Sequence, residues 1–298
     1  MKIKDKSRIV LGCMRISGME PKERERLIMT AYESGINYFD HADIYGGGVS
    51  EEVFAHTFEQ LSLKREEVIL QSKCGIREGM YDFSREYILT AVDKILGRLK
   101  TDYLDVLLLH RPDALCEPEE VAEAFSQLHK KGKVLHFGVS NHNHYQIELL
   151  RKYVKQDILF NQLQFSIMHT GMIDAGLNVN MKVENSVDHD GGVMDYCRLH
   201  GITIQAWSPF QYGFFEGVFL ENDGFPELNR TIDRIADKYG VTNSAVAIAW
   251  ILRHPAGIQA VIGTTNPNRV KDISLAEGFN LSRKEWYEIY LAAGNKLP

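Results

Sequence analysis

Eight short apolar runs are spread along the whole chain, and they restrict the possible folds more than any other feature. They lie at 9–11, 36–39, 68–71, 103–109, 134–139, 158–163, 202–206 and 258–262. Each is a few residues long and carries apolar side chains on both faces, which is typical of strands in a parallel sheet covered by helices. The sequence therefore predicts eight buried strands.

Longer stretches with helical spacing separate most of these runs. The predicted helices are 21–33, 83–99, 119–130, 144–153, 228–239, 243–253 and 269–277. Pro21 suits the first turn of its helix and Gly35 a C-terminal cap, while Ser84 is a suitable N-cap. Strands that alternate with helices indicate a parallel β/α fold.

Eight strand–helix units favour a closed barrel over an open sheet. We therefore expect an α/β fold, a single (β/α)₈ TIM barrel that spans residues 1–298 and has its active site at the C-terminal mouth of the strands. No Pro/Gly/Ser-rich linker divides the chain. The segment 166–192 is polar and interrupted by glycines, so we expect an extended loop there on the barrel mouth.

Composition excludes several classes of function. The net charge of −6 gives no sign of nucleic-acid binding, and no run of 18 apolar residues predicts a membrane span. The first twelve residues have charges but no apolar stretch as long as the hydrophobic region of a signal peptide, so no signal peptide is expected. The four cysteines are widely spaced, which fits a reducing cytoplasm and argues against a disulfide framework or a zinc ribbon.

Polar side chains follow almost every predicted strand. In a barrel of this kind the carboxyl ends of the strands meet at one mouth, where the chemistry takes place. Packing alone does not require an ionisable or amide group at each strand end. The residues at or just after the predicted strand ends that carry polar atoms are Arg15, Asp40, Lys73, His110, Ser140, Asn141, Gln162, Trp207 and Thr264.

The stretch FDHADIYGG after the second strand holds two acids, a histidine and a tyrosine. A lysine buried at the end of the third strand needs a partner, and Asp40 on the neighbouring strand is the natural one for Lys73. An ammonium beside a phenol lowers the pKa of the phenol, so we expect Tyr45 to donate a proton near neutral pH. His110 is placed to bond the same substrate oxygen.

Several motifs together resemble the aldo-keto reductases, and in particular bacterial oxidoreductases of that family. The catalytic motifs are DHADIYGG, QSKCG and LLLHRPD. Further similarity runs through VLG, GKVLHFGVSN, NQLQFS, AWSPF and VIGTTNPNR, and so covers nearly the whole chain. The resemblance implies that an aldehyde or ketone is reduced with a nicotinamide cofactor that lies across the barrel mouth without a Rossmann glycine motif.

The resemblance assigns catalytic roles to four residues. Tyr45 matches the general acid of the family. Asp40 and Lys73 match the pair that adjusts its acidity, and His110 matches the residue that orients the carbonyl.

The resemblance also assigns the cofactor site and favours NADPH, with NADH possible. Ser140, Asn141 and Gln162 match the side chains that hold the carboxamide, and Trp207 matches the aromatic that stacks on the nicotinamide. Arg269 lies in the first turn of a helix, where it is suited to pair with a 2′-phosphate. The remaining expected contacts are Gly12, Met14, Arg15, Asp40, Ser208, Pro209, Phe210, Gly263, Thr264, Thr265 and Asn266.

Two other functions stay open at this point. One is a metal-dependent hydrolase on the same barrel, with His41, Asp43 and His110 as ligands. The other is a non-catalytic subunit that senses NADPH. Under the favoured hypothesis no metal is bound, the partner is a small carbonyl substrate, and the chain is a monomer or a weak homo-oligomer. Candidate pocket residues are Met14, Met168, His169, Phe210, Tyr212 and Phe214.

Overall fold

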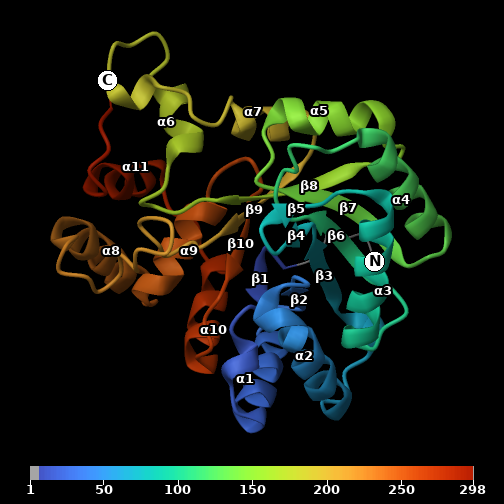
Figure 1. Ribbon diagram of the computed structural model, residues 1–298. Helices are drawn as coiled ribbons and strands as arrows, with labels where there is room; N and C mark the ends of the chain where they lie inside the picture. The colour runs from blue at the N-terminus through green and yellow to red at the C-terminus, as the bar shows by residue number, and fades with distance from the viewer. Residues whose placement is uncertain (1–6, 298) are drawn as a thin grey trace.

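The computed structural model describes residues 7–297 as a closed barrel of eight parallel strands (Figure 1). The order around the barrel is β1-β10-β9-β8-β7-β6-β3-β2. The predicted (β/α)₈ barrel is therefore confirmed. Residues 1–6, part of the segment where no signal peptide is expected, lie outside the described residues.

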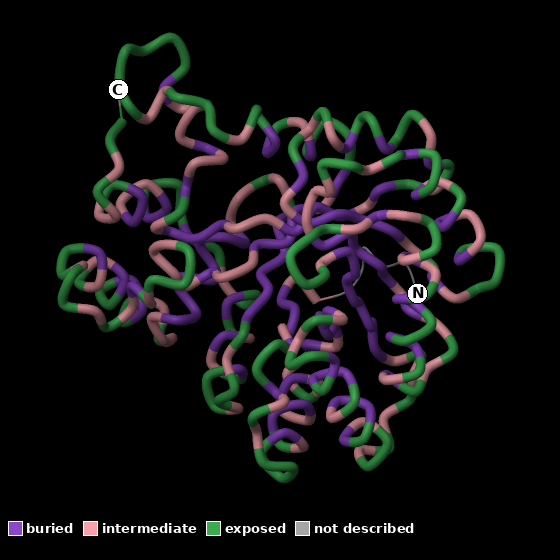
Figure 2. The backbone as a smooth tube through the Cα atoms, viewed as in Figure 1, coloured by how far each residue is buried: buried purple, intermediate pink, exposed green. Residues whose placement is uncertain are grey.

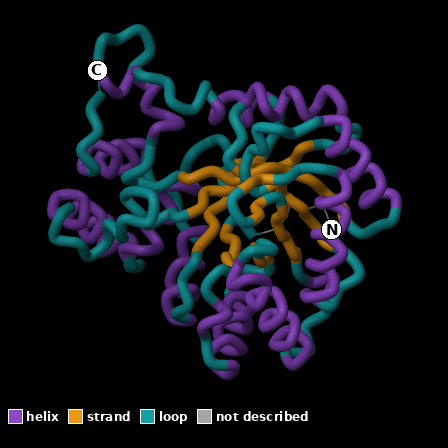
Figure 3. Tube along the Cα trace, in the orientation of Figure 1, coloured by secondary structure: helices purple, strands orange, loops and turns teal. Residues whose placement is uncertain are grey.

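Each predicted strand has a counterpart in the barrel. The barrel strands are β1 Ile9–Gly12, β2 Tyr38–Asp40, β3 Ile69–Cys74, β6 Leu104–Leu109, β7 Val134–Ser140, β8 Ile158–Gln164, β9 Thr203–Trp207 and β10 Gln259–Ile262. Two further strands, β4 Ile76–Arg77 and β5 Met80–Tyr81, form a separate antiparallel hairpin. Figure 3 shows the barrel strands at the centre with helices around them.

The helices form the outer layer of the barrel. They are α1 Pro21–Glu33, α2 Val49–Gln60, α3 Arg85–Leu99, α4 Pro118–Lys130, α5 His144–Tyr153, α6 Gly171–Leu177, α7 Val193–Leu199, α8 Pro226–Tyr239, α9 Asn243–Leu252, α10 Pro267–Ser274 and α11 Arg283–Ala292. The predicted N-cap is confirmed, because Ser84 accepts a hydrogen bond from the backbone N–H of Tyr87. None of the described helices has the length and apolar character that a membrane span requires.

The segment 166–192 is not an extended loop throughout, which corrects that expectation. It contains the short helix α6 and a 3₁₀ turn at Glu184–Ser186. Buried Ile173 anchors α6, and Tyr290 of α11 donates a hydrogen bond of 2.7 Å to Asp174. This contact with a distant helix stabilises a turn that local sequence does not favour.

The main core lies between the strands and the surrounding helices, and Figure 2 shows that most residues of the barrel strands are buried. A second, smaller apolar cluster fills the barrel interior and includes Val10, Val106 and Phe160. Alternation along each strand separates the two cores, because neighbouring side chains point to opposite faces. The barrel interior also holds buried glutamines, among them Gln71 and Gln205, which lie close to the site described next.

Candidate active site

A cavity of about 650 Å³ opens at the carboxyl ends of the barrel strands. Every residue that the sequence assigns to the cofactor lines it, from Gly12 at the end of β1 to Arg269 of α10. Tyr45 and His110 line the same cavity, whereas Lys73 is fully buried beneath its surface. The structure therefore gathers the predicted site residues at one mouth, as the parallel topology requires.

Lys73 is held by three acceptors, one for each proton of its ammonium group. Nζ lies 2.7 Å from Oδ2 of Asp40, 2.8 Å from the backbone oxygen of His41 and 3.1 Å from the hydroxyl oxygen of Tyr45. An ammonium has three donors and no acceptor, so all its hydrogen-bonding capacity is used. Burial is the largest single influence and lowers the pKa of Lys73, but the charges of Asp40 and Tyr45 and the hydrogen bonds to them together outweigh it, so the pKa is raised. Lys73 is therefore a fixed positive charge beside the phenol.

The pKa of Tyr45 is raised, not lowered, which corrects the expectation from sequence. Burial of the phenol raises this pKa more than the nearby charge of Lys73 lowers it. The chain folds Tyr45 into the start of a 3₁₀ turn, Tyr45–Gly48, which places its hydroxyl against Lys73. The phenol thus keeps its proton at neutral pH.

His110 follows β6 directly and faces Tyr45. The centroids of the two rings are 6.1 Å apart and the planes meet nearly edge to face. Burial, and then the charges of Lys73 and Arg111, lower the pKa of His110 well below its ordinary value. The imidazole is therefore neutral and has one N–H to donate.

Asp40 is fixed by amide side chains as well as by Lys73. Its Oδ1 accepts hydrogen bonds from Nε2 of Gln71 at 2.6 Å and from Nε2 of Gln162 at 3.1 Å. Gln205 Oε1 accepts a further hydrogen bond from each of these two amides. No role of Gln71 or Gln205 was predicted from sequence, although each is a polar residue in an apolar run, which is a detectable signal.

His41 and Asp43 have surroundings that differ from those of the catalytic candidates. The ring of His41 packs edge-on against Phe54, and neither ring nitrogen has a hydrogen-bond partner among the described residues. Burial lowers the pKa of His41 to about 3. Burial raises the pKa of Asp43 to about 6, and its Oδ2 accepts a hydrogen bond from the hydroxyl of Tyr87.

Asn141, Ser140 and Trp207 form a connected polar group on the cavity wall. Asn141 donates to Oγ of Ser140 at 2.8 Å, and Nε1 of Trp207 donates to Oδ1 of Asn141 at 3.1 Å. Asn141 and Ser208 have positive φ angles of 59° and 51°, which cost free energy for residues other than glycine. Such strain at a cavity wall is typical of a functional site.

The far end of the cavity meets the N-terminus of α10. The side chain of Asn266 caps this helix by accepting hydrogen bonds from the backbone N–H groups of Asn268 and Arg269. The guanidinium of Arg269 is exposed and takes part in no ion pair among residues 7–297. The first N–H groups of this helix are thus already bonded, and the free guanidinium is the donor at this end of the cavity that is suited to a phosphate group.

Several residues of the cavity were missed by the sequence analysis. Arg111 directly follows His110, and Asn243 and Ser244 begin α9 behind an N-cap that a threonine provides. These positions carry no signal that separates them from ordinary loop and cap residues. The other missed residues are Ile44, Ile76, Gln211, Phe215, Val218, Leu220, Glu221, Val261 and Ile262.

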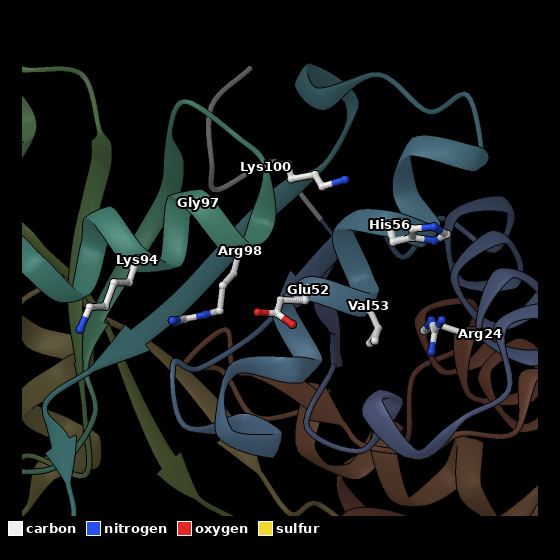
Figure 4. Close-up of a pocket in the computed structure, with 8 residues that line it drawn as sticks. All are labelled: Arg24, Glu52, Val53, His56, Lys94, Gly97, Arg98 and Lys100. Carbon is white, nitrogen blue, oxygen red and sulfur yellow. The ribbon is translucent and has the colours of Figure 1, made fainter.

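A separate, shallow hollow lies between α2 and α3, on the outer layer of the barrel. Figure 4 shows the residues that line it: Arg24, Glu52, Val53, His56, Lys94, Gly97, Arg98 and Lys100. None of them was assigned to the site from sequence. Arg98 still affects the site indirectly, because it pairs with Glu51 at 2.7 Å next to the turn that carries Tyr45.

Within residues 7–297, no three His, Cys, Asp or Glu side chains are grouped so that they could hold a metal ion. The ligand set of the hydrolase hypothesis, His41, Asp43 and His110, is therefore not assembled in the described part of the chain.

Comparison with known proteins gives a consistent result. The model of the aldo/keto reductase family matches residues 8–291. The uncharacterized oxidoreductase YcsN of Bacillus subtilis is 33% identical over 98% of this chain and 96% of its own length. A 6-dehydroglucose reductase of Agrobacterium fabrum is 32% identical over 97% and 95%, respectively. The solved structure of the thermostable aldo-keto reductase Tm1743 shares the fold, with a TM-score of 0.76 at 24% identity over 96% of this chain and 95% of that chain.

Proposed function

The chain belongs to the aldo/keto reductase family and is an oxidoreductase of that type, and we propose that it reduces an aldehyde or ketone to an alcohol with NADPH, with Tyr45 as the general acid. The observation that carries the proposal is the hydrogen bond from Lys73, itself held by Asp40, to Tyr45, which lies beside His110 in the cavity at the barrel mouth.

The residues of the cavity fit a nicotinamide cofactor. A carboxamide both donates and accepts hydrogen bonds, and Ser140, Asn141 and Gln162 offer both kinds of group. The indole of Trp207 provides a flat apolar face beside them. When bound, the reduced nicotinamide supplies the hydride to the carbonyl carbon.

Tyr45 provides the proton for the carbonyl oxygen. Its raised pKa keeps the phenol protonated at neutral pH, so the proton is available. As the O–H bond of the phenol breaks, negative charge develops on the phenol oxygen 3.1 Å from Nζ of Lys73. Because the ammonium is already oriented by Asp40, it stabilises this charge without rearrangement.

His110 directs the carbonyl oxygen toward Tyr45. A neutral imidazole donates one hydrogen bond and does not compete with Tyr45 as an acid. The two rings lie edge to face with their centroids 6.1 Å apart, and both residues line the same cavity.

The preference for NADPH over NADH rests on Thr264, Asn266 and Arg269. The exposed guanidinium of Arg269, in the first turn of α10, is the group suited to a 2′-phosphate. We expect Arg269→Ala to raise the KM for NADPH about tenfold and to leave the KM for NADH unchanged. Comparable turnover with both cofactors in the unmodified protein would argue against the preference.

The main test measures NADPH oxidation with a panel of aldehydes and ketones. The panel includes a sugar-derived aldehyde, since one relative is named a 6-dehydroglucose reductase. We expect Tyr45→Phe to lower kcat by about 10²–10⁴-fold and to leave NADPH affinity nearly unchanged.

Each alternative predicts a different result. Tight NADPH binding without turnover of any carbonyl would favour the sensing subunit. Stoichiometric zinc or manganese with hydrolytic activity would favour the hydrolase. A near-normal rate in Tyr45→Phe would show that another group donates the proton.

A further inference from the structure

The hollow between α2 and α3 has no part in the proposed reaction, but the charge of its lining suits an anion. Its volume is about 680 Å³, within the range of about 300–1,000 Å³ that small-molecule sites occupy. Two arginines and two lysines line it against one carboxylate, that of Glu52, in a chain whose net charge is −6. Figure 4 shows these groups: Lys94 and Arg98 come from α3, Lys100 directly follows that helix, and Arg24 comes from α1.

Arg24 is a buried cation without an acidic partner. Only 5% of the residue is exposed, and it takes part in no ion pair among residues 7–297. Its Nε donates to Oγ1 of Thr57 at 2.7 Å, and its Nη1 donates to the backbone oxygens of Ile16 and Met19 at 3.4 and 3.0 Å. Nη2 forms no hydrogen bond in the described part of the chain. Because a buried arginine is ordinarily paired with an anion, Arg24 offers a charge and a free donor to a ligand in the hollow.

The three basic groups on the α3 side are only partly neutralised. Arg98 pairs with Glu51 at 2.7 Å. Lys100 pairs with Glu59 at the same distance. Arg98 uses its Nε for this pair, and its Nη2 has no hydrogen-bond partner among the described residues. Lys94 is exposed and takes part in no ion pair in the range 7–297. The hollow therefore keeps unused positive charge and unused N–H donors.

A phosphate group fits this lining better than other common small-molecule groups. A neutral ligand would leave Arg24 without a counter-charge, and a single carboxylate brings one charge and two oxygens. A phosphate monoester carries a charge of about −1.5 to −2 and three acceptor oxygens, and guanidinium groups bind phosphate oxygens in pairs. The net charge of −6 disfavours a long polyanion such as a nucleic acid, so the fitting ligand is small.

Both arginines of the hollow also hold loops at the mouth of the barrel. The backbone oxygens that Arg24 bonds belong to the 3₁₀ turn Ile16–Gly18 and the residue after it, and this turn directly follows two residues that line the active-site cavity. The side chain of Arg98 lies next to Gly48, in the turn that begins with Tyr45. An anion that fixes the two guanidinium groups therefore restrains both loops.

We propose that the hollow between α2 and α3 is a second ligand site, which binds a small phosphate compound and restrains the two loops that Arg24 and Arg98 contact. The ligand is either free phosphate or a phosphate group on an organic molecule, since both present the same oxygens. The site is separate from the barrel mouth, and its occupation requires neither coenzyme nor turnover.

Isothermal titration calorimetry measures the binding directly. The titrated protein is Arg269→Ala, because Arg269 offers a guanidinium to phosphate at the barrel mouth. We expect pyrophosphate to bind at one site per chain, and inorganic phosphate to bind there more weakly because it carries less charge. Tighter binding of glycerol 3-phosphate than of inorganic phosphate assigns the site to an organic phosphate, and the reverse order assigns it to the free ion. Citrate, whose charges are on carboxylates, should bind about tenfold more weakly than pyrophosphate.

Substitutions of Lys94, made in the same protein, locate the site. Lys94→Met removes the unpaired charge and should weaken pyrophosphate binding about tenfold. Lys94→Arg keeps the charge and should restore the binding. Lys130→Met is the matched control, since Lys130 is an exposed lysine at the end of α4 that does not line the hollow, and binding should not change.

Hydrogen exchange of the backbone amides measures the restraint of the loops. With pyrophosphate bound, exchange should slow in residues 16–19 and 46–51, which are the segments that the two arginines contact. The same amides should show no slowing in Lys94→Met at the same pyrophosphate concentration. Slower exchange in the wild-type loops alone links the occupied hollow to the mouth.

The outcomes are independent of the proposed carbonyl reduction, because none of these measurements uses turnover. The inference is overturned if pyrophosphate binding does not saturate, or if Lys94→Met and Lys130→Met bind it equally well. Citrate binding as tight as that of pyrophosphate would overturn the assignment to phosphate. Saturable binding with unchanged exchange in both loops would overturn the restraint.

Discussion

The side-chain amide of Gln71 donates a hydrogen bond of 2.6 Å to Oδ1 of Asp40, from the position directly opposite on the neighbouring strand. Oε1 of Gln71 in turn accepts a hydrogen bond of 2.7 Å from the hydroxyl of Tyr38. Gln205, which accepts a hydrogen bond from Gln71, donates one through its Nε2 to Oε1 of Gln259 on β10. The carboxylate that orients Lys73 is thus held by a connected group of buried amides in the barrel interior.

Gln71→Met should lower kcat about tenfold, because Asp40 loses one of its donors and orients Lys73 less firmly; a tenfold effect corresponds to about 1.4 kcal/mol. The affinity for NADPH, measured by fluorescence titration, should not change. Gln259→Met is the control, since Gln259 is in the same group but does not contact Asp40, and kcat should stay the same. Equal losses in the two variants would indicate general destabilisation of the barrel.

The rate of carbonyl reduction should be constant from about pH 6 to pH 9 and fall only above about pH 10. Tyr45 is active in its protonated form, and burial raises its pKa, so activity is retained below that pKa and is lost as the pH rises through it. The pKa of His110 is well below its ordinary value, so protonation of His110 causes no loss near pH 6.5. A pH profile of kcat checks both directions, and a decline that begins near pH 7 would contradict the raised pKa of Tyr45.

His41 should make the folded state less stable as the pH falls below about 6.5. Its pKa is about 3 in the folded chain and about 6.5 when unfolded, so the unfolded state binds more protons between these values. Between pH 7 and pH 5 this costs about 2 kcal/mol of unfolding free energy.

His41→Leu tests this effect. Leucine removes the titrating ring without breaking a hydrogen bond, since neither ring nitrogen has a partner among the described residues. Urea denaturation at pH 7 and pH 5 should show a loss about 2 kcal/mol smaller in the variant. Parallel pH dependence in the two proteins would mean that His41 is protonated or unburied in the native state.

Gly47 and Gly48 offer a matched pair of substitutions in the turn after Tyr45. Both have positive φ angles, 65° and 97°, so alanine is strained at either position. A Cβ at Gly47 meets nothing within 4 Å, whereas one at Gly48 lies 3.0 Å from Cδ and 3.1 Å from Nε of Arg98.

We expect Gly47→Ala to lower the unfolding free energy by about 1 kcal/mol and Gly48→Ala to lower it by about 2–3 kcal/mol, because Arg98 must move away from Glu51. Gly48→Ala should also lower kcat, since the same turn positions Tyr45. Chemical denaturation and steady-state kinetics measure the two effects. Equal costs at the two positions would show that Arg98 adapts freely.

The strands and their polar ends could be predicted because local pattern and topology agree. A short run whose side chains are apolar on both faces predicts a buried strand. Parallel strands then bring their carboxyl ends to one mouth of the barrel. Asp40 on β2 and Lys73 on β3 therefore had to lie close together. Their contact at 2.7 Å confirms the predicted partnership, and their catalytic roles remain predictions.

The helix α2 was not predicted, for a reason visible in its buried face. That face carries Ser50, Glu51 and Thr57 as well as apolar residues, so its hydrophobic periodicity is weak. Glu51 is tolerated inside because Ser72 and Arg98, distant in sequence, bond its two oxygens. Local sequence does not reveal such partners. The sign of the Tyr45 pKa shift was missed for the same reason, since it depends on the extent of burial.

α11 was also not predicted, although a signal was present. Ser282 and Glu285 form a capping box at its start, in which each side chain bonds the backbone of the other. A search for this four-residue pattern would have found the helix.

Arg111, Asn141 and Trp207 form a wall shared by the active-site cavity and a second cavity of about 440 Å³ beside it, and this wall limits how the enzyme can be diversified. Changes in these three residues alter both cavities at once, so their effects on different ligands will be coupled and hard to combine. Gln164 and Asp190 line only the second cavity. Libraries that vary these two positions and keep the wall fixed offer a route to new substrate ranges with an unchanged coenzyme requirement.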